Sequence, residues 1–383
     1  MGNEQTVAEF FAGIGLMRLG LEHAGWHVVW ANDIDEDKRA MYAGNFPDAA
    51  DHFHLGDVHA LGPGDVPTVD LATASFPCND LSLAGARRGL AGQHSSAFWG
   101  FAKALKNMSR RPPLVLLENV AGFLSSNNGD DFRDVCLALN ELGYAVDAFI
   151  IDALLFVPQS RQRMFIVGKQ EKRKIGRVAE KTPSFYQSQL RPASLADFIL
   201  WHPEINWSIR SLPPIRKRVM SISDIIEDIP ANSTYWWSTQ RAEYLLNQMS
   251  KKHRAIADAM ISGKTLTYGT VFRRVRHGRS MAELRTDGIA GCLRTPRGGS
   301  GRQILFVAGK GRYAVRLLTP RECARLMGAD DFKITGSLNK ALFGFGDAVC
   351  VPVIEWIGKH YLNPVWEELY ATEGQKEHQR ATA

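Results

Sequence analysis

The sequence has few cysteines, and none of them stands in a paired spacing. Its 383 residues include five, namely Cys78, Cys136, Cys292, Cys323 and Cys350. Without a CxxC pair or a dense cysteine pattern, neither a disulfide framework nor a structural zinc site is expected. This usage is typical of a reducing compartment, and we expect a cytoplasmic protein.

The chain also lacks internal repeats, low-complexity segments and long apolar runs. We find no run that reaches the roughly 20 residues needed by a membrane helix, and no signal peptide at the amino terminus. We therefore expect no membrane contact. His52, His54 and His59 lie near Asp57 in the sequence. Such an H-x-H pattern on a loop arises mostly by chance, and we expect no metal.

Acidic residues are scarce in one part of the chain. Residues 161–325 hold 31 Lys and Arg against 12 Asp and Glu, a net charge of +19, whereas the remainder carries −13 and the whole chain +6. A mild overall charge would indicate only solubility. A split this large favours one face that contacts the phosphates of a polyanion. The length allows two domains with cores of their own.

Up to about residue 168, apolar strand-like runs alternate with helical patterns. This alternation predicts an α/β fold in which helices flank a parallel sheet. The predicted strands are 6–11, 28–32, 71–75, 114–117, 146–152 and 164–168, and the predicted helices are 16–24, 38–45, 98–107 and 132–142. Ligands bind such sheets beyond the carboxyl ends of the strands.

A glycine turn follows the first predicted strand, in Phe11-Ala12-Gly13-Ile14-Gly15. Glycines permit a tight turn and let a ligand approach the backbone. The third glycine of the dinucleotide fingerprint is missing, with Arg18 in its place, so a pyrophosphate fits poorly. The next strand ends in Asn32-Asp33-Ile34-Asp35, where an acidic side chain can accept hydrogen bonds from ribose hydroxyls. S-adenosylmethionine, a nucleoside without a pyrophosphate, fits better than NAD.

Three further motifs carry reactive groups and lie at the ends of apolar runs. They are Ser75-Phe76-Pro77-Cys78, Glu118-Asn119-Val120 and Gln159-Ser160-Arg161-Gln162-Arg163. A thiol, a carboxylate and two guanidiniums are the groups needed to add a sulfur nucleophile to an electron-poor ring.

Each of these side chains also has a simpler interpretation. A free cysteine is usually a small buried hydrophobe. Glu118 could be a strand-end carboxylate that caps a helix, and Asp57 could cap a turn. Arg161 and Arg163 alternate along an extended segment and could form a solvated strand edge.

In this order, the motifs resemble those of the DNA (cytosine-5) methyltransferases of bacterial and phage type. The matching segments are 11–15, 32–35, 56–58, 76–78, 118–120, 159–163, 293–299 and 344–349, and together they span roughly residues 6–357. Any one of them is weak, but the ordered set is strong. The resemblance implies the Rossmann-like sheet of S-adenosylmethionine-dependent methyltransferases and a smaller, irregular target-recognition domain.

The resemblance also implies the chemistry. The thiolate of Cys78 adds to carbon 6 of cytosine, Glu118 contacts N3 and the exocyclic amine of the base, and Arg163 favours the thiolate. The implied catalytic set is Cys78, Glu118, Arg163, Arg161 and Gln159. The implied cofactor-binding set is Phe11, Ala12, Gly13, Ile14, Gly15, Asp33, Ile34, Asp57, Val58, Pro77, Asp347 and Ala348. The implied DNA-binding set is Ser82, Arg273, Arg274, Arg276, Arg279, Arg294 and Arg297.

The resemblance divides the chain into a cofactor-binding catalytic domain, 1–176 and 338–383, a target-recognition domain, 177–310, and a hinge, 311–337. The densest cationic stretch of the recognition domain is 273–279. It could read bases or grip phosphates, and we favour phosphates because positioning contacts outnumber base contacts. We expect the tryptophans of this region, among them Trp201, Trp207, Trp236 and Trp237, to be domain core.

The resemblance predicts an enzyme that methylates a flipped cytosine in duplex DNA, acts as a monomer and belongs to a restriction-modification system with a separately encoded endonuclease. Two alternatives stay open. One is an RNA cytosine-5 methyltransferase, and the other is a sequence-specific DNA-binding protein that has lost catalysis.

Overall fold

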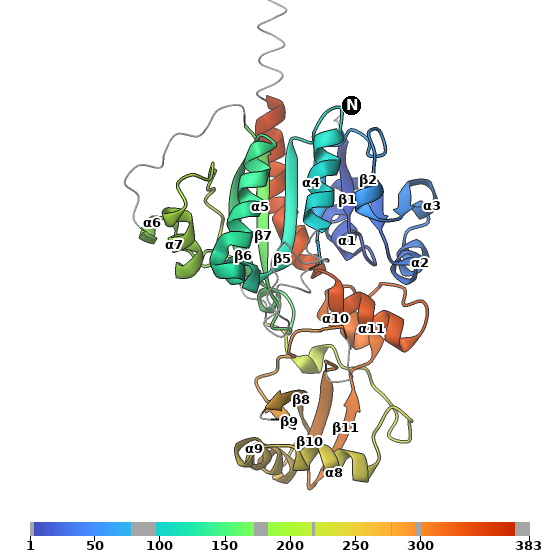
Figure 1. Cartoon of the computed structure of the whole chain (residues 1–383). Coiled ribbons are helices and arrows are strands. Elements are labelled where there is room, and N and C mark those ends of the chain that lie inside the picture. The colour runs from blue at the N-terminus through green and yellow to red at the C-terminus, as the bar shows by residue number, and fades with distance from the viewer. Residues whose placement is uncertain are drawn as a thin grey trace, which may run out of the picture. The chain divides into compact units, whose positions relative to one another are not determined.

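The structure is a computed structural model that describes residues 4–77, 97–171, 183–216, 219–276, 278–295 and 301–371. The chain forms two compact units (Figure 1). The first comprises Met1–Ile151, Gln162–Ile215 and Val353–Ala383, and the second comprises Asp152–Arg161 and Arg216–Pro352. This division by contacts differs from the expected domain boundaries for residues 152–161, 177–215 and 338–352.

Within the described residues, the first unit holds a seven-stranded sheet in the order β3-β2-β1-β4-β5-β7-β6. The strands are β1 Gln5–Phe10, β2 Trp26–Asp33, β3 Phe53–Leu55, β4 Leu71–Ala74, β5 Leu114–Val120, β6 Tyr144–Asp152 and β7 Gln162–Gln170. The five strands from β3 to β5 pair in parallel. Their carboxyl ends therefore lie at one edge of the sheet, where the sequence predicts the ligands.

One strand departs from the predicted parallel sheet. β7 runs antiparallel to β5. Residues 153–161, which connect β6 to β7, are too few for the crossover that returns a chain in the parallel direction. The fold is therefore a mixed sheet flanked by helices, and the predicted α/β class is confirmed.

The first unit also contains helices. They include α1 Leu16–Glu22, α2 Glu36–Asn45, α3 Ala49–His52, α4 Ala97–Asn107, α5 Asp130–Glu141, α6 Pro183–Tyr186 and α7 Ala193–Trp201. In α4, Phe98, Phe101 and Leu105 recur at the spacing of one helix face and are buried. Phe101 meets Phe10 of β1 edge to face, with 5.0 Å between ring centroids. One apolar cluster thus joins α4 and α5 to β1, β4 and β5.

The carboxyl-terminal helical stretch packs against β6. It includes α12 Val351–Ile357 and a π-helical turn, Gly358–Leu362. Tyr361 stacks on Phe149 at 5.6 Å and donates a hydrogen bond to Asp147, 3.1 Å away. Arg191 reaches the same buried carboxylate at 2.7 and 2.9 Å. Burial raises the pKa of Asp147, and the charge of Arg191 opposes that rise. This network attaches two distant segments to one strand.

The second unit contains a regular sheet where the sequence suggested an irregular domain. Its described strands follow the order β11-β10-β8-β9 and pair antiparallel. They are β8 Thr267–Arg276, β9 Arg279–Arg285, β10 Ile304–Gly309 and β11 Arg312–Leu317. The helices of this unit are α8 Thr239–Asn247, α9 Lys251–Ser262, α10 Pro320–Leu326 and α11 Leu338–Asp347. Leu245, Ala257 and Phe306 belong to its apolar core.

One helical stretch, Leu338–Ala371, is long and apolar enough to cross a membrane by length and composition alone. Of its most apolar window, 67% is buried inside the protein, as in a core helix.

Candidate active site

Glu118 and Arg163 form an ion pair near the end of two adjacent strands of the first unit. Glu118 lies on β5 and is buried, and Arg163 lies on β7. Arg163 Nε approaches Glu118 Oε1 at 2.9 Å, and Ser75 donates a hydrogen bond to the other carboxyl oxygen. The carboxylate therefore has a fixed orientation at the sheet edge where ligands are expected.

The segment that leads to the predicted nucleophile is held by its neighbours. Phe76 is buried and lies 5.6 Å from the ring of Phe98 and 5.9 Å from that of Phe123. Asn119 donates a hydrogen bond to the carbonyl of Phe76 at 3.4 Å. Pro77 follows and is exposed. Cys78 and Ser82 lie outside the described residues, so their assignments remain predictions.

The glycine turn after β1 has the backbone strain typical of a ligand site. Phe11, which is not a glycine, has a φ of 57°, a left-handed conformation that costs about 1–2 kcal/mol. Gly13 has a φ of 57°, and a Cβ there would meet only one atom of the described residues within 4 Å. Space for a ligand therefore adjoins Gly13. Gly15 is different, because a Cβ there would lie 2.3 Å from the ring of Phe46.

Asp33 orders this turn. Its carboxylate accepts hydrogen bonds from the amides of Gly13, at 2.8 Å, and Asp35, at 2.9 Å. A carboxylate offers about four acceptor positions, so these two bonds leave capacity for ribose hydroxyls. Ile34 beside it is 70% exposed and presents an apolar surface. Free space, acceptor capacity and an apolar surface suit a nucleoside.

Asp57 lies after β3 and caps a short 3₁₀ turn, Val58–Ala60, by accepting from the amide of His59 at 2.9 Å. Asp57 therefore caps a turn, as its simpler interpretation predicts. The side chain is nevertheless exposed, so the capping role and the predicted cofactor role are compatible. Val58 is buried beneath it.

Gln159 and Arg161 belong to the second unit, unlike Glu118 and Arg163. Both are buried. Arg161 donates to the carbonyls of Leu293, Gly346 and Ala348 at 2.9, 3.1 and 2.5 Å. Gln159 likewise binds the carbonyl of Leu326 and the amide of Leu293. These contacts of the two side chains hold backbone segments in place.

These positions overturn one of the simpler interpretations. A solvated strand edge would leave both arginines exposed, but Arg161 is 2% exposed and the side chain of Arg163 is 16% exposed. Asp347 and Ala348 follow Gly346 at the end of α11, and Asp347 is exposed. Arg161 thus orders the segment that carries both predicted cofactor residues.

A buried charge network lies behind the glycine turn, and the sequence reading missed it. Arg18 is 4% exposed and binds Glu22 at 2.6 Å, Asp48 at 2.9 Å and the hydroxyl of Tyr42 at 3.1 Å. Arg18 therefore links α1 to α2 and α3. The sequence feature that could have revealed this network is the i, i+4 spacing of Arg18 and Glu22, which indicates a helix ion pair.

Glu9 of β1 is buried as well, and no described side chain donates a hydrogen bond to it. Burial raises the pKa of Glu9 to about 8, against the opposing charge of Arg18. The sequence pattern did not single out Glu9, because this acid lies within an apolar run that predicts a strand.

Four predicted DNA-contacting arginines lie on the β8–β9 hairpin, and Arg274, Arg276 and Arg279 are exposed there. Arg294 is exposed too, while Arg297 lies outside the described residues. The tryptophans of this region differ in burial. Trp207 is buried in the first unit's core, but Trp201 is 72% exposed, so the expectation of domain core is wrong for Trp201.

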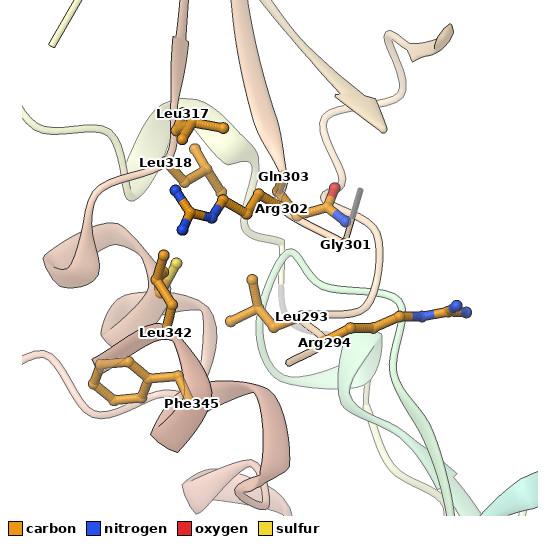
Figure 2. Close-up of a pocket in the computed structure, with 10 residues that line it drawn as sticks. Leu293, Arg294, Gly301, Arg302, Gln303, Leu317, Leu318, Leu342 and Phe345 are labelled. Atoms are coloured by element: carbon orange, nitrogen blue, oxygen red, sulfur yellow. The ribbon is translucent and has the colours of Figure 1, made fainter. Parts of the chain in front are cut away.

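A small pocket in the second unit adjoins Arg294. Figure 2 shows apolar side chains such as Leu293, Leu318 and Phe345 around it, with the guanidinium of Arg294 extending away. Its volume of about 20 Å³ suits a single water molecule. A nucleobase would not fit. Elsewhere in the described part of the chain, no group of three or more His, Cys, Asp or Glu side chains could hold a metal ion.

Comparisons with known proteins find similar sequences. The sequence matches the family described as C-5 cytosine-specific DNA methylase over residues 5–363. It is 31% identical over 235 residues to the type II methyltransferase M.HaeII of Haemophilus aegyptius, which covers 55% of this chain and 72% of that protein. It is 26% identical over 355 residues to M.HhaI of Haemophilus parahaemolyticus, which covers 91% of each.

A solved structure has a similar fold. The S. pombe Dnmt2 methyltransferase superimposes with a TM-score of 0.61 at 18% identity, over 94% of this chain and 99% of that one. At this identity, the likeness shows the fold alone.

Proposed function

The chain belongs to the C-5 cytosine-specific DNA methylase family and is a DNA cytosine-5 methyltransferase, and on this basis we propose that it acts through a covalent adduct between Cys78 and a flipped cytosine. The observation that carries this proposal is the Glu118–Arg163–Ser75 arrangement at the end of β5. It stands beside the anchored segment that leads to Cys78.

S-adenosylmethionine is the methyl donor of this family, and the glycine turn fits it. Gly13, Asp33 and Ile34 hold its nucleoside, with Asp57 and Val58 at the neighbouring strand end. Asp347 and Ala348 complete the proposed set. The group supplies a sulfonium methyl, which is electrophilic.

Carbon 5 of cytosine is a poor nucleophile until another bond is made at carbon 6. The Cys78 thiolate forms that bond, and the ring becomes an enamine. Carbon 5 then takes the methyl group as the bond between that group and the sulfonium sulfur breaks, which leaves a thioether. A base accepts the proton from carbon 5, and the bond between the Cys78 sulfur and carbon 6 breaks to release 5-methylcytosine and the thiolate. The bond between the Cys78 sulfur and carbon 6 is thus formed and broken within one reaction cycle.

Glu118 and Arg163 have different roles in this reaction: Glu118 acts on the cytosine ring, and Arg163 acts on Glu118 and on the thiolate. Glu118 contacts N3 and the exocyclic amine, so the charge that moves onto the ring meets a positioned partner. Arg163 holds Glu118 by its Nε at 2.9 Å and places a positive charge where a thiolate is favoured. Gln159 and Arg161 are positioning residues in this account, because their contacts are to backbone groups.

A stacked cytosine hides carbon 6 from any thiol. The base must therefore rotate out of the duplex, at an unstacking cost of a few kcal/mol. The basic segment 161–325 supplies the contacts that offset this cost. We accordingly assign target recognition to residues 177–310, cofactor binding and catalysis to 1–176 and 338–383, and a hinge to 311–337.

The names of two relatives support a proposal about the cellular context. Both M.HaeII and M.HhaI are named type II methyltransferases. We propose that this chain works in the cytoplasm as a monomer, alongside a separately encoded restriction endonuclease.

The function is tested by expressing the chain in cells that lack cytosine methylation and sequencing their DNA and transfer RNA after bisulfite treatment. We expect 5-methylcytosine at one DNA sequence and none in RNA. Methylation of RNA alone would favour the RNA enzyme, and methylation of neither would favour the silent DNA-binding protein.

A further inference from the structure

Part of the β8–β9 hairpin extends beyond the four-stranded sheet of the second unit. β10 pairs with β8 only from Thr267 to Val271. Among the described residues, β8 beyond Val271 pairs with β9 alone, through the pair Arg276 and Arg279 at its end. Val275 near this end is 71% exposed. The chain thus presents a two-stranded antiparallel ribbon, an element that the major groove of DNA admits.

The two faces of this ribbon differ in chemistry. Val271, Ala282 and Leu284 share one face, and they are buried in the core of the unit. The register places Arg274, Arg276 and Glu283 on the opposite face. Arg273 alternates with these arginines and therefore belongs to the core face.

Glu283 holds two of the arginines on the outer face, Arg274 and Arg276. Its Oε2 lies 3.3 Å from Arg274 Nε, and its Oε1 accepts from Nε and a terminal nitrogen of Arg276 at 3.2 and 3.1 Å. The guanidinium of Arg274 also lies over the ring of Phe272, 4.6 Å from its centroid. About half of each arginine side chain stays exposed, 50% for Arg274 and 55% for Arg276.

A carboxylate at this place argues against a phosphate clamp. At this end of the outer face, three arginines, Arg274, Arg276 and Arg279, and one glutamate leave a net charge of +2. A phosphate close to Arg274 and Arg276 would be repelled by Glu283. The edges of the bases carry no net charge and impose no such repulsion. A guanidinium held along one side can also present its remaining N–H groups to the O6 and N7 of guanine.

The spacing suits adjacent positions in a groove. Side chains two residues apart on a strand are about 6.8 Å apart, which is about two base-pair steps of 3.4 Å. Arg274 and Arg276 could thus contact bases two steps apart. Because Glu283 already holds both side chains in the protein without DNA, they lose less conformational freedom when they bind the bases.

We propose that Arg274 and Arg276 read guanines in the major groove of the target sequence and that Glu283 is the positioning residue for both. The inference rests on the methylation of duplex DNA by this chain. It assigns sequence specificity to the outer face of the hairpin and gives Arg273 no part in it.

The test compares variants on a duplex library randomised around the site that the wild-type protein methylates. Arg274→Ala and Arg276→Ala should each lose discrimination at one guanine position by roughly 5- to 150-fold. Arg274→Lys and Arg276→Lys should lose it as well, because lysine retains the charge but not the two-pronged geometry. Arg254→Ala is the matched control, and it should retain the wild-type specificity. Arg254 forms an exposed ion pair with Asp258 on α9.

Glu283→Gln provides a readout that a merely structural role would not give. It should relax specificity at both guanine positions and raise affinity for unrelated duplexes, because a negative charge near DNA is removed. Thermal unfolding of each variant confirms that the unit is folded.

Two results would overturn the inference. If lysine variants behave as wild type, and alanine variants weaken all duplexes alike with a salt slope lower by about 0.9 each, the arginines grip phosphates. If Arg274→Ala and Arg276→Ala leave specificity intact, recognition lies elsewhere. Failure of the wild-type protein to methylate any DNA would instead refute the proposed function, so the two failures are distinguishable.

Discussion

Arg163 Nε lies 2.9 Å from Oε1 of Glu118, and Ser75 binds the other oxygen of the same carboxylate. Glu118→Gln keeps the shape of the side chain but removes its charge and replaces one of the two acceptor oxygens with an amide donor. We expect kcat to fall by about 10²- to 10⁴-fold, the usual range for a group that assists proton transfer. DNA affinity should stay within about twofold. Single-turnover methylation and DNA titration measure the two effects.

The exposed Glu141 on α5 provides the control for that variant, and Glu141→Gln should behave as wild type. A Glu118→Gln protein with the wild-type kcat would remove Glu118 from the chemistry.

Asp33 joins the glycine turn to the end of β2, since its carboxylate accepts from the amides of Gly13 and Asp35. Asp33→Ala should weaken S-adenosylmethionine binding by about tenfold or more, because it removes the ribose acceptor and the anchor of the turn. DNA affinity should not change, as no phosphate contact is lost. Calorimetry measures the cofactor affinity. The matched variant is Asp35→Asn, which keeps a good helix cap for α2. Equal cofactor affinity in Asp33→Ala and wild type would refute the assignment.

Arg161 separates a positioning role from a catalytic one. Its guanidinium binds three carbonyl groups in the second unit, and Arg161→Met leaves these groups without their partner. We expect the free energy of unfolding to fall by about 3–5 kcal/mol. Denaturant titration measures this loss. Arg133→Ala, which breaks an exposed ion pair on α5, should cost at most about 1 kcal/mol. A fully stable but inactive Arg161→Met protein would instead place Arg161 in the chemistry.

Glu9 makes stability depend on pH. Burial raises its pKa in the folded protein from 4.5 to about 8, so the folded state retains a proton that the unfolded state loses. This contribution to stability is complete below pH 4.5 and is lost as pH rises through 8. The free energy of unfolding of wild type relative to Glu9→Gln should therefore fall by at most about 4 kcal/mol between pH 5 and pH 9. Denaturant titrations at several pH values test this, and a pH-independent difference would contradict it.

The sequence predicts the sheet edge well because its determinants are local. An apolar run followed by Gly, Pro or Glu identifies where β1, β4 and β5 end, and parallel pairing brings those ends together. Glu118 could therefore be placed near Ser75 from pattern alone. The position of Arg163 could not be predicted in this way, because its side chain reaches Glu118 only through the antiparallel pairing of β7 with β5.

Long-range contacts account for what the sequence could not predict. Nothing local indicates that Arg161 binds carbonyls at positions 293 and 346, or that Trp207 is buried with the first unit's core. The pairing of Glu283 with Arg274 and Arg276 likewise depends on the register of a hairpin. Sequence composition shows a basic segment there, but it does not show which charges are compensated.

The central claim is that Cys78 forms the bond to carbon 6, and trapping the adduct tests it most directly. A duplex with 5-fluorocytosine at the target position cannot complete the reaction, since fluorine does not leave as a proton does. With S-adenosylmethionine, the wild-type protein and Cys292→Ser should form a complex that resists denaturation, and Cys78→Ser should form none. Cys136 and Cys323 are poor alternatives, because burial raises the pKa of both thiols. Mass spectrometry should find the nucleotide on the peptide that contains Cys78. An adduct on any other residue, or a complex with Cys78→Ser, would contradict the account.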